Sequence, residues 1–305
     1  MDTALFLRIG FERGELFSNS EINELLAQSA LINKILSAEN SRSNPILSLI
    51  FKLSALSEIP YSEHLSAVNS LIAKLNNEAA TEVGFSYTGN LIDIVPCYNA
   101  MVLEAFARFG LGQTKACQNA LNWIKQYQLF ERNQHTDWQH QGIFKHGGCL
   151  GKTPCYIGIG KTIRALLTYR TFSDYPDQQV DALIEKGLSY MARHQFFLRL
   201  SDNQPISKHI TANIFPQSYF LSLADLIYIY SKSNYFDKQS TKALMTLVKS
   251  KAMNREQQYK MDYLYRYPGY VPFNSRRGPS DWLSYLYPLW LDEARINTIN
   301  EGANK

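Results

Sequence analysis

Two kinds of helical segment alternate along this chain. Segments of the first kind are apolar on nearly every side, and each follows a proline. Segments of the second kind are amphipathic and begin at or near a Ser, Thr or Asp, residues that cap helix N-termini. A helix that is apolar all round is buried, whereas an amphipathic helix covers a core with one face. The pattern therefore predicts inner helices that alternate with outer helices.

The two sets can be assigned by position. The inner segments are predicted at 46–56, 98–109, 156–169, 219–230 and 282–291. The outer segments are predicted at 20–36, 62–75, 114–127, 177–195 and 237–251.

The prolines that precede the inner segments recur at a long and nearly regular interval. They are Pro45, Pro96, Pro154, Pro216 and Pro279, with spacings of 51, 58, 62 and 63 residues. Proline suits the first turn of a helix, where its missing N–H leaves no hydrogen bond unmade. Repetition at a fixed period indicates one structural unit used several times. We therefore predict an all-α fold, a partial or closed α/α toroid of about five helix pairs, with helix starts within about four residues of these prolines.

Composition is compatible with one large body. The chain has 305 residues, of which 45% are hydrophobic and 13% aromatic, enough for a large core and an aromatic surface beside it. We assign residues 1–305 to a single toroid domain, with 1–19 as an N-terminal extension and 293–305 as a flexible tail. The net charge of +4 is scattered, which argues against a nucleic-acid binder.

The N-terminal segment and the cysteines bear on the compartment. Arg8, Glu12, Arg13 and Glu15 interrupt the first apolar stretch, so it does not resemble a signal peptide. No run approaches the roughly 20 apolar residues that span a bilayer. Four cysteines do not suggest a disulfide scaffold, and thiols stay reduced in a cytoplasm. We expect a cytoplasmic protein that is not transmembrane.

Repeated motifs in the outer segments resemble the toroid superfamily of terpenoid cyclases and protein prenyltransferases. That repeat ends an outer helix with a basic residue, Gly, two residues, an aromatic, an aliphatic, three residues and Gln. The stretch 186–195 fits with Lys186, Gly187, Tyr190, Met191 and Gln195, and the stretch 123–128 fits the second half of the pattern. The chain looks like a short, stand-alone member. The resemblance implies a toroid fold and favours an enzyme, a transferase or a cyclase- or lyase-like one.

The same resemblance bears on possible catalytic residues. Squalene-hopene-type cyclases carry an Asp-rich proton-donor motif that this chain lacks. Protein prenyltransferases bind zinc through an Asp and a Cys that begin one inner helix and a His that begins another. Here Asp93 precedes Cys97, and His146 precedes Cys155, at comparable helix starts. The spacing differs from that family's, so these residues are only candidates: Asp93, His146 and Cys155 for catalysis.

A cluster of soft ligands stands before the third inner segment. His146, Cys149 and Cys155 lie within ten residues, and the tripeptide Pro-Cys-Tyr at 154–156 repeats that at 96–98. The repeat predicts that Cys97 and Cys155 lie at the same end of neighbouring inner helices. Zinc prefers thiolates and imidazoles in tetrahedral geometry. The four residues are therefore a candidate zinc or redox site, and the alternative is that they are buried packing residues.

The end of the barrel where the inner helices begin, which we call the mouth, is predicted to be basic and aromatic. Lys152, Lys208, Arg276 and Arg277 precede inner segments, and helix N-termini favour anions. Ordinary surface solvation is the alternative for these four. The aromatic candidates for the substrate site, or else for packing between repeats, are Tyr98, Tyr156, Tyr219 and Trp282.

Two long loops, 131–153 and 255–278, are rich in aromatic and polar residues, which is typical of functional loops. Three functions remain open. The first is an enzyme acting on an apolar or isoprenoid substrate with an anionic head group, with or without zinc. The second is a lanthionine-cyclase-like enzyme on the same toroid, and the third is a non-catalytic toroid that binds a peptide or protein partner in its concave mouth.

Overall fold

The computed structural model describes residues 1–140, 149–233 and 238–303, and the side chains of these residues except at 238 and 293–303. Within those ranges the chain forms twelve α-helices and two short 3-10 helices, and its only β-type pairings are two isolated bridges. The helices are α1 (Thr3–Glu12), α2 (Asn19–Gln28), α3 (Ala30–Ser37), α4 (Pro45–Leu56), α5 (Ser66–Ala79), α6 (Pro96–Arg108), α7 (Lys115–Tyr127), α8 (Tyr156–Phe172), α9 (Gln178–Arg193), α10 (Leu223–Lys232), α11 (Lys238–Lys251) and α12 (Asp281–Ala303). The 3-10 helices are η1 (Ser62–His64) and η2 (Leu91–Asp93).

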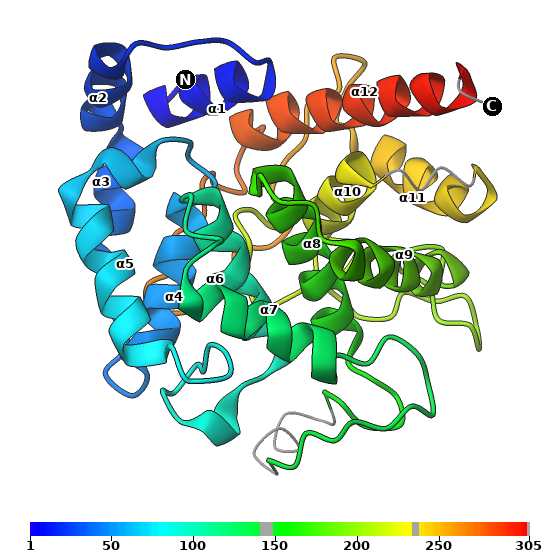
Figure 1. The fold of residues 1–305 in the computed structure, drawn as a ribbon. Coiled ribbons are helices and arrows are strands. Elements are labelled where there is room, and N and C mark those ends of the chain that lie inside the picture. The colour runs from blue at the N-terminus through cyan, green and yellow to red at the C-terminus, as the bar shows by residue number, and fades with distance from the viewer. Residues whose placement is uncertain (141–148, 234–237, 304–305) are drawn as a thin grey trace.

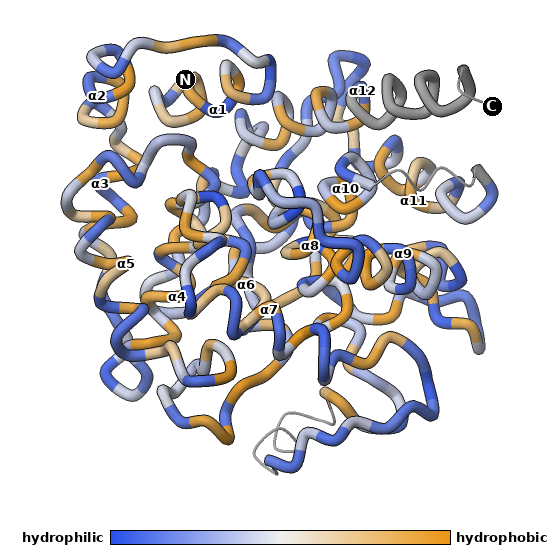
Figure 2. The backbone as a smooth tube through the Cα atoms, in the orientation of Figure 1, coloured by the Kyte–Doolittle hydropathy of each residue, from blue (hydrophilic) through white to orange (hydrophobic). Residues whose placement is uncertain are grey.

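The helices form two concentric layers, as in an α/α toroid (Figure 1). The inner layer follows the order α4, α6, α8, α10, α12 and α1, each helix packed against the next. The outer helices α5, α7 and α9 cover α4, α6 and α8, and α11 packs against α9. The predicted fold class is therefore confirmed. Figure 2 shows apolar residues concentrated where the two layers meet.

Four of the five prolines mark helix starts as predicted. Pro45 and Pro96 are the first residues of α4 and α6, and α8 and α12 begin two residues after Pro154 and Pro279. The prediction is wrong at Pro216, because α10 begins seven residues later, at Leu223. Ser222 and Asp225 form a capping box there, each side chain bonding the other residue's backbone N–H. A cap of this kind is a stronger start signal than an isolated proline.

The two chain ends contribute to the layers. Residues 1–19, assigned from the sequence to an extension, contain α1, which packs against α2 and α12. The predicted outer helix 20–36 is divided at Ser29, whose hydroxyl caps α3 by accepting the N–H of Ile32. Helix α12 continues to Ala303, into the segment 293–305 assigned to a tail. No helix among the described residues is both long and apolar enough to cross a membrane.

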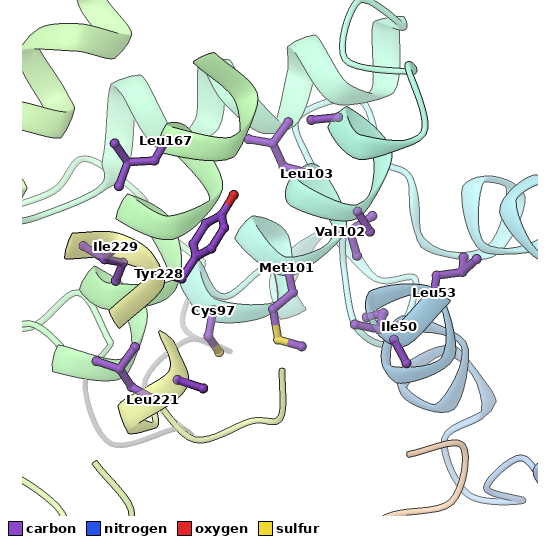
Figure 3. Close-up of a cluster of buried hydrophobic side chains, with 14 of the residues drawn as sticks. Ile50, Leu53, Cys97, Met101, Val102, Leu103, Leu167, Leu221, Tyr228 and Ile229 are labelled. Carbon is purple, nitrogen blue, oxygen red and sulfur yellow. The ribbon is translucent and has the colours of Figure 1, made fainter. Parts of the chain in front are cut away.

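Close packing in the inner layer depends on small residues. A Cβ atom at Gly160 of α8 would overlap the side chain of Leu221, and one at Gly187 of α9 would overlap Ile163 of α8. Around these contacts a continuous apolar core joins α4, α6, α8 and α10 (Figure 3).

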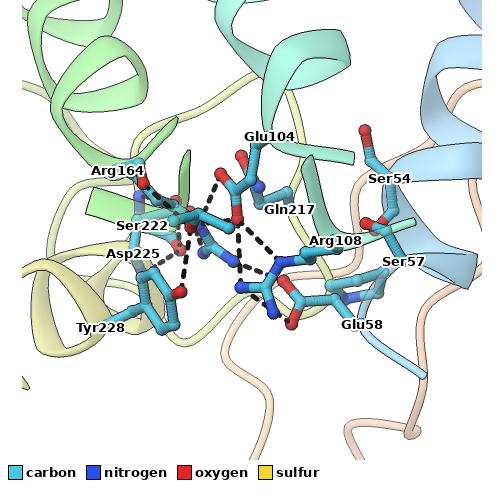
Figure 4. Close-up of polar contacts among 12 residues, drawn as sticks. Ser54, Ser57, Glu58, Glu104, Arg108, Arg164, Gln217, Ser222, Asp225 and Tyr228 are labelled. Carbon is cyan, nitrogen blue, oxygen red and sulfur yellow. Dashed lines mark hydrogen bonds and ion pairs between the residues drawn. The ribbon is translucent and has the colours of Figure 1, made fainter. Parts of the chain in front are cut away.

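A network of buried ion pairs joins the inner helices. Arg164 of α8 is the hub: it pairs with Glu58 after α4, with Glu104 of α6 at 3.0 Å and with Asp225 of α10 at 2.7 Å (Figure 4). The Arg164 guanidinium also lies over the ring of Tyr228, 4.6 Å from its centroid. The acids have further cations: Lys161 pairs with Asp225, Arg108 with Glu104, and Arg8 of α1 with both Glu58 and Glu12.

Candidate active site

A cavity of about 310 Å³ lies at the beginnings of α6 and α8. Five tyrosines and three cysteines form most of its wall, contributed by these two helices and by the loops before α6, α8, α10 and α12. The lining residues are Leu47, Tyr87, Val95, Cys97, Tyr98, Cys149, Cys155, Gly158, Tyr219, Tyr265 and Tyr267. We call this the tyrosine cavity.

The tyrosine rings form a continuous aromatic wall. The Tyr98 ring lies 5.4 Å from that of Tyr87 and 6.0 Å from that of Tyr219, and the Phe51 ring lies 5.3 Å from both Tyr265 and Tyr267. Burial, with the nearby charge of Asp93, raises the pKa of Tyr87 to about 12, and burial with neighbouring phenols raises that of Tyr265 to about 12. These phenols are therefore neutral at physiological pH and can donate hydrogen bonds but not act as ready bases.

Cys155 has a different electrostatic environment from the other two cysteines in the wall. It stands at the N-cap of α8, where the N–H groups of Ile157 and Gly158 point at its sulfur and the Cys149 thiol donates a hydrogen bond to it. The Cys149 hydrogen bond, aided by those N–H groups, lowers the pKa of Cys155 despite burial. The same hydrogen bond and burial raise the pKa of Cys149, and burial raises that of Cys97 to about 12. Of the three cysteines in the wall, Cys155 is therefore the one whose pKa is lowered and not raised.

Of the other two catalytic candidates, one is near the tyrosine cavity and one is not described. Asp93 is buried and accepts a hydrogen bond from the Thr88 hydroxyl at 2.8 Å. Its charge helps to raise the pKa of Tyr87, but Asp93 does not itself line the cavity. His146 lies outside the described residues.

The zinc set remains a prediction. Cys97, Cys149 and Cys155 share the cavity wall. Over the part of the chain that the structure describes, no group of three or more His, Cys, Asp or Glu side chains is arranged to hold a metal ion. The fourth expected ligand, His146, falls outside that part.

The four basic residues predicted at the mouth do not line the tyrosine cavity. Lys152, Lys208, Arg276 and Arg277 are all exposed. Lys208 is linked to the cavity through aromatic rings: its neighbour His209 stacks on Phe220 at 4.0 Å, and Phe220 contacts Tyr265 at 5.5 Å. Among the described residues, no comparable chain of ring contacts joins Lys152, Arg276 or Arg277 to the cavity.

The four aromatic candidates divide into two pairs. Tyr98 and Tyr219 line the tyrosine cavity. Tyr156 instead turns outward, where its hydroxyl donates to the carbonyl of Phe196 at 2.9 Å and its ring packs against His194. Trp282 lines a separate cavity of about 200 Å³ beside α1. Tyr156 and Trp282 therefore do not line the tyrosine cavity, and their substrate role stays a prediction.

Three tyrosines of the cavity were not among the candidates. Tyr265 and Tyr267 belong to the long loop 255–278, and alternate positions of an extended chain face the same way, so this spacing was a usable signal. Tyr87 lies before η2 in a segment without a distinguishing motif, and nothing in the sequence marks it.

Comparisons with known proteins bear on the fold. Neither a protein-family model nor a curated protein matches the chain. A solved structure described as a polysaccharide lyase is similar over 98% of this chain and 90% of its own, with a TM-score of 0.53 and 8% sequence identity. At that identity the likeness shows the fold alone. The chain is an α/α toroid.

Proposed function

We propose that this protein is a toroid enzyme that binds an apolar, isoprenoid-type molecule with an anionic head group in the tyrosine cavity, with Cys155 as its reacting group. The observation that carries the proposal is the position of Cys155 at a helix N-terminus in the wall of an aromatic cavity, where its pKa is lowered. Apolar pockets with a few convergent polar groups and a titratable residue of shifted pKa are typical of active sites.

The size and lining of the cavity support an apolar ligand. Its volume of about 310 Å³ is near the lower end of the range for small-molecule sites, about 300–1,000 Å³. Tyrosine faces attract cations as well as covering hydrocarbon, so the wall suits a substrate that develops positive charge on carbon.

The chemistry we propose is an elimination. The bond from an allylic carbon to its anionic head group breaks, and the head group leaves with the electron pair. The resulting carbocation is stabilised by the tyrosine faces and by the Cys155 thiolate. The thiolate then takes a proton from the adjacent carbon as a double bond forms. Among the described residues that line the cavity, Cys155 is the one held as an anion.

The leaving head group would be received by the mouth. The N-termini of α6 and α8 face the cavity and favour negative charge. Of the four predicted cations, Lys208 is the best placed to bind the head group, because its neighbour His209 contacts Phe220, and Phe220 contacts Tyr265 in the cavity wall. We keep Lys152, Arg276 and Arg277 as weaker candidates.

Calorimetric titration tests the proposal with geranyl diphosphate, geraniol and inorganic pyrophosphate as separate ligands. We expect geranyl diphosphate to bind most tightly, and Tyr219→Ala to weaken it at least tenfold. Tyr175→Ala is the matched control, because Tyr175 is 67% exposed and distant from the cavity lining. Product analysis should then show hydrocarbon and pyrophosphate with the wild type and not with Cys155→Ser, whereas Cys117→Ser should retain activity.

Two results would reject the proposal: pyrophosphate alone binding as tightly as geranyl diphosphate, or Tyr219→Ala binding like the wild type. Peptide binding in the mouth would then become the better hypothesis. Metal analysis of the purified protein tests the zinc alternative separately, since stoichiometric zinc would assign Cys155 to a ligand set with Cys97, Cys149 and His146.

A carbohydrate is a second candidate ligand. Five tyrosine rings can stack on sugar faces, and the structural neighbour is described as a polysaccharide lyase. The described lining holds no Arg, Lys or His that could pair with an acidic sugar, which favours the apolar ligand. Titration with neutral and acidic oligosaccharides, again compared between wild type and Tyr219→Ala, distinguishes the two.

A further inference from the structure

Cys149 and Cys155 are joined by two interactions. The backbone N–H of Cys155 donates to the carbonyl of Cys149 at 3.2 Å, and the Cys149 thiol donates to the Cys155 sulfur. With ordinary backbone dimensions, a hydrogen bond of this length places the two Cα atoms within about 7 Å, in the reach of a disulfide. Both cysteines are free thiols in this structure.

The two sulfurs differ in accessibility. Cys155 is half-buried and Cys149 is buried, and both border the tyrosine cavity. A small molecule in the cavity therefore reaches Cys155 more readily. Cys97, the third thiol of the wall, is on α6 and shares no backbone hydrogen bond with Cys155.

We propose that Cys155 and Cys149 form a reactive dithiol that exchanges with a small uncharged disulfide entering the tyrosine cavity, with Cys155 as the attacking thiol and Cys149 as the resolving thiol. This activity is separate from the elimination proposed above and does not require an isoprenoid ligand. The aromatic, uncharged lining selects for small neutral disulfides over large charged ones.

The exchange balances in two steps. The Cys155 thiolate attacks one sulfur of R–S–S–R, forming Cys155–S–S–R and releasing R–S⁻, which takes up a proton. The Cys149 thiol then loses its proton and attacks the Cys155 sulfur, forming the Cys149–Cys155 disulfide and releasing the second R–S⁻. In total, two protein thiols are oxidised and one disulfide is reduced to two thiols.

The arrangement at α8 supports this order of attack. The first step takes place at the more accessible of the two sulfurs, that of Cys155, which stands at the N-cap of α8, where a helix N-terminus favours a thiolate. The backbone hydrogen bond between Cys155 and Cys149 keeps the resolving residue beside the mixed disulfide, and both residues border the same cavity.

The experiment treats the reduced full-length protein with bis(2-hydroxyethyl) disulfide at neutral pH, followed by acid quench and intact-mass spectrometry. We expect the wild type to become lighter by two hydrogen atoms and to carry no adduct. Cys149→Ser should instead accumulate one 2-hydroxyethylthio group on Cys155. Cys155→Ser should react at least about tenfold more slowly, because it lacks the activated thiolate.

One further variant serves as a control, Cys117→Ser, which lies outside the cavity lining and should behave like the wild type. A tryptic peptide map of the oxidised wild type identifies the disulfide directly, without any substitution. Trypsin cleaves after Lys152, between the two cysteines, so their disulfide would join two peptides.

Three outcomes overturn the proposal: a stable adduct on the wild type, a disulfide that joins Cys97 to Cys155, or reaction of Cys155→Ser at the wild-type rate. Because no isoprenoid is present, none of them bears on ligand binding in the tyrosine cavity. Conversely, a failure of geranyl diphosphate to bind leaves the exchange reaction untouched.

Discussion

Cys155 is set apart from Cys97 and Cys149 by local backbone geometry. It is the residue immediately before α8, so N–H groups without helical partners face its sulfur. Cys97 is one residue inside α6, where burial in neutral surroundings raises its pKa instead. The hydrogen bond from Cys149, together with this position at the helix start, lowers the pKa of Cys155 and distinguishes it from Cys97.

The pH dependence of alkylation tests this difference. The pKa of Cys155 is lowered from 9.0 to about 6, so its reaction with iodoacetamide should rise from pH 5 to 7 and level off above that. Cys149→Ala removes the largest stabilising hydrogen bond, and the half-point should move towards 9. Mass spectrometry of the labelled Cys155 peptide measures the rate at each pH, and Cys117→Ala is the control.

The other titratable groups at this site should not distort that profile. Cys97 and Tyr219 face Cys155 from α6 and from the loop before α10, and burial raises the pKa of both. Both stay neutral between pH 5 and 8. Lys161, deeper in α8, is paired with Asp225. An unchanged half-point in Cys149→Ala would show that the S–H···S contact does not activate Cys155.

The cysteine positions were predictable and most tyrosine positions were not, for a physical reason. The repeated Pro-Cys-Tyr places Cys97 and Cys155 at helix starts, where local sequence determines geometry. Tyr265 and Tyr267 reach the cavity from a loop whose path depends on contacts with distant residues such as Phe51. The alternate spacing of Tyr265 and Tyr267 indicates that they face the same way, but it does not show that the loop brings them to this cavity.

Among the elements, α10 shows how two start signals compete. Residues after Pro216 could have begun a helix, but this segment is bonded to a distant loop instead. The backbone carbonyl of Asn213 accepts hydrogen bonds from the N–H groups of Asp262 and Tyr263. The Pro216 carbonyl likewise accepts the Tyr270 hydroxyl at 2.9 Å, so the chain is irregular up to Ser222, and Tyr219 in this segment lines the tyrosine cavity. The proline repeat was a sound guide to the number and order of inner helices, and it failed where tertiary contacts delayed a helix.

Removal of the α10 cap tests this account. Ser222 caps α10 and its hydroxyl also donates to the Ile214 carbonyl, all of it buried. We expect Ser222→Ala to lower the free energy of unfolding by about 1–2 kcal/mol. Ser18→Ala removes the similar but exposed capping box of α2 and should cost about 0.5–1 kcal/mol. Urea denaturation measures both, and equal losses would contradict a special role for the α10 start.

Across the whole molecule, the buried ions join helices that are far apart in sequence. Arg164 contacts acids from three other segments, separated from it by 60 to 106 residues. The sequence showed charged residues inside apolar segments, yet it could not show which would pair. The network ties the inner helices α6, α8 and α10, and the residues just after α4, to one another through buried charges.

Loss of the hub should therefore be far more costly than loss of a surface ion pair. Arg164→Leu leaves buried acids short of a partner, and we expect a loss of about 3–5 kcal/mol of unfolding free energy. Arg170→Leu, on the same helix, breaks an exposed pair with Asp181 and should cost at most about 1 kcal/mol. Comparable effects in the two variants, measured by chemical denaturation, would argue against a central role for Arg164.

The acid limb of the stability curve tests the network without removing its hub. Burial alone would raise the pKa of Glu12, but Arg8 and Lys232, with a Trp290 hydrogen bond, lower it to about 2 from an ordinary 4.5. Because the folded-state pKa is the lower one, Glu12 stabilises the fold fully above about pH 4.5, and this contribution is lost as pH falls towards 2.

Glu12→Gln keeps the shape of the side chain and removes this titration. Between pH 4.5 and 2 the free energy of unfolding should therefore fall less steeply in the variant than in the wild type, by up to about 1.4 kcal/mol per pH unit. The variant should be the less stable protein at pH 7, where the wild-type carboxylate is ionised and paired with Arg8 at 2.8 Å. Urea denaturation at pH 7, 5, 4 and 3 gives both quantities. Parallel curves for the two proteins would mean that Glu12 keeps its ordinary pKa and that α1 is held against the barrel by its apolar face alone.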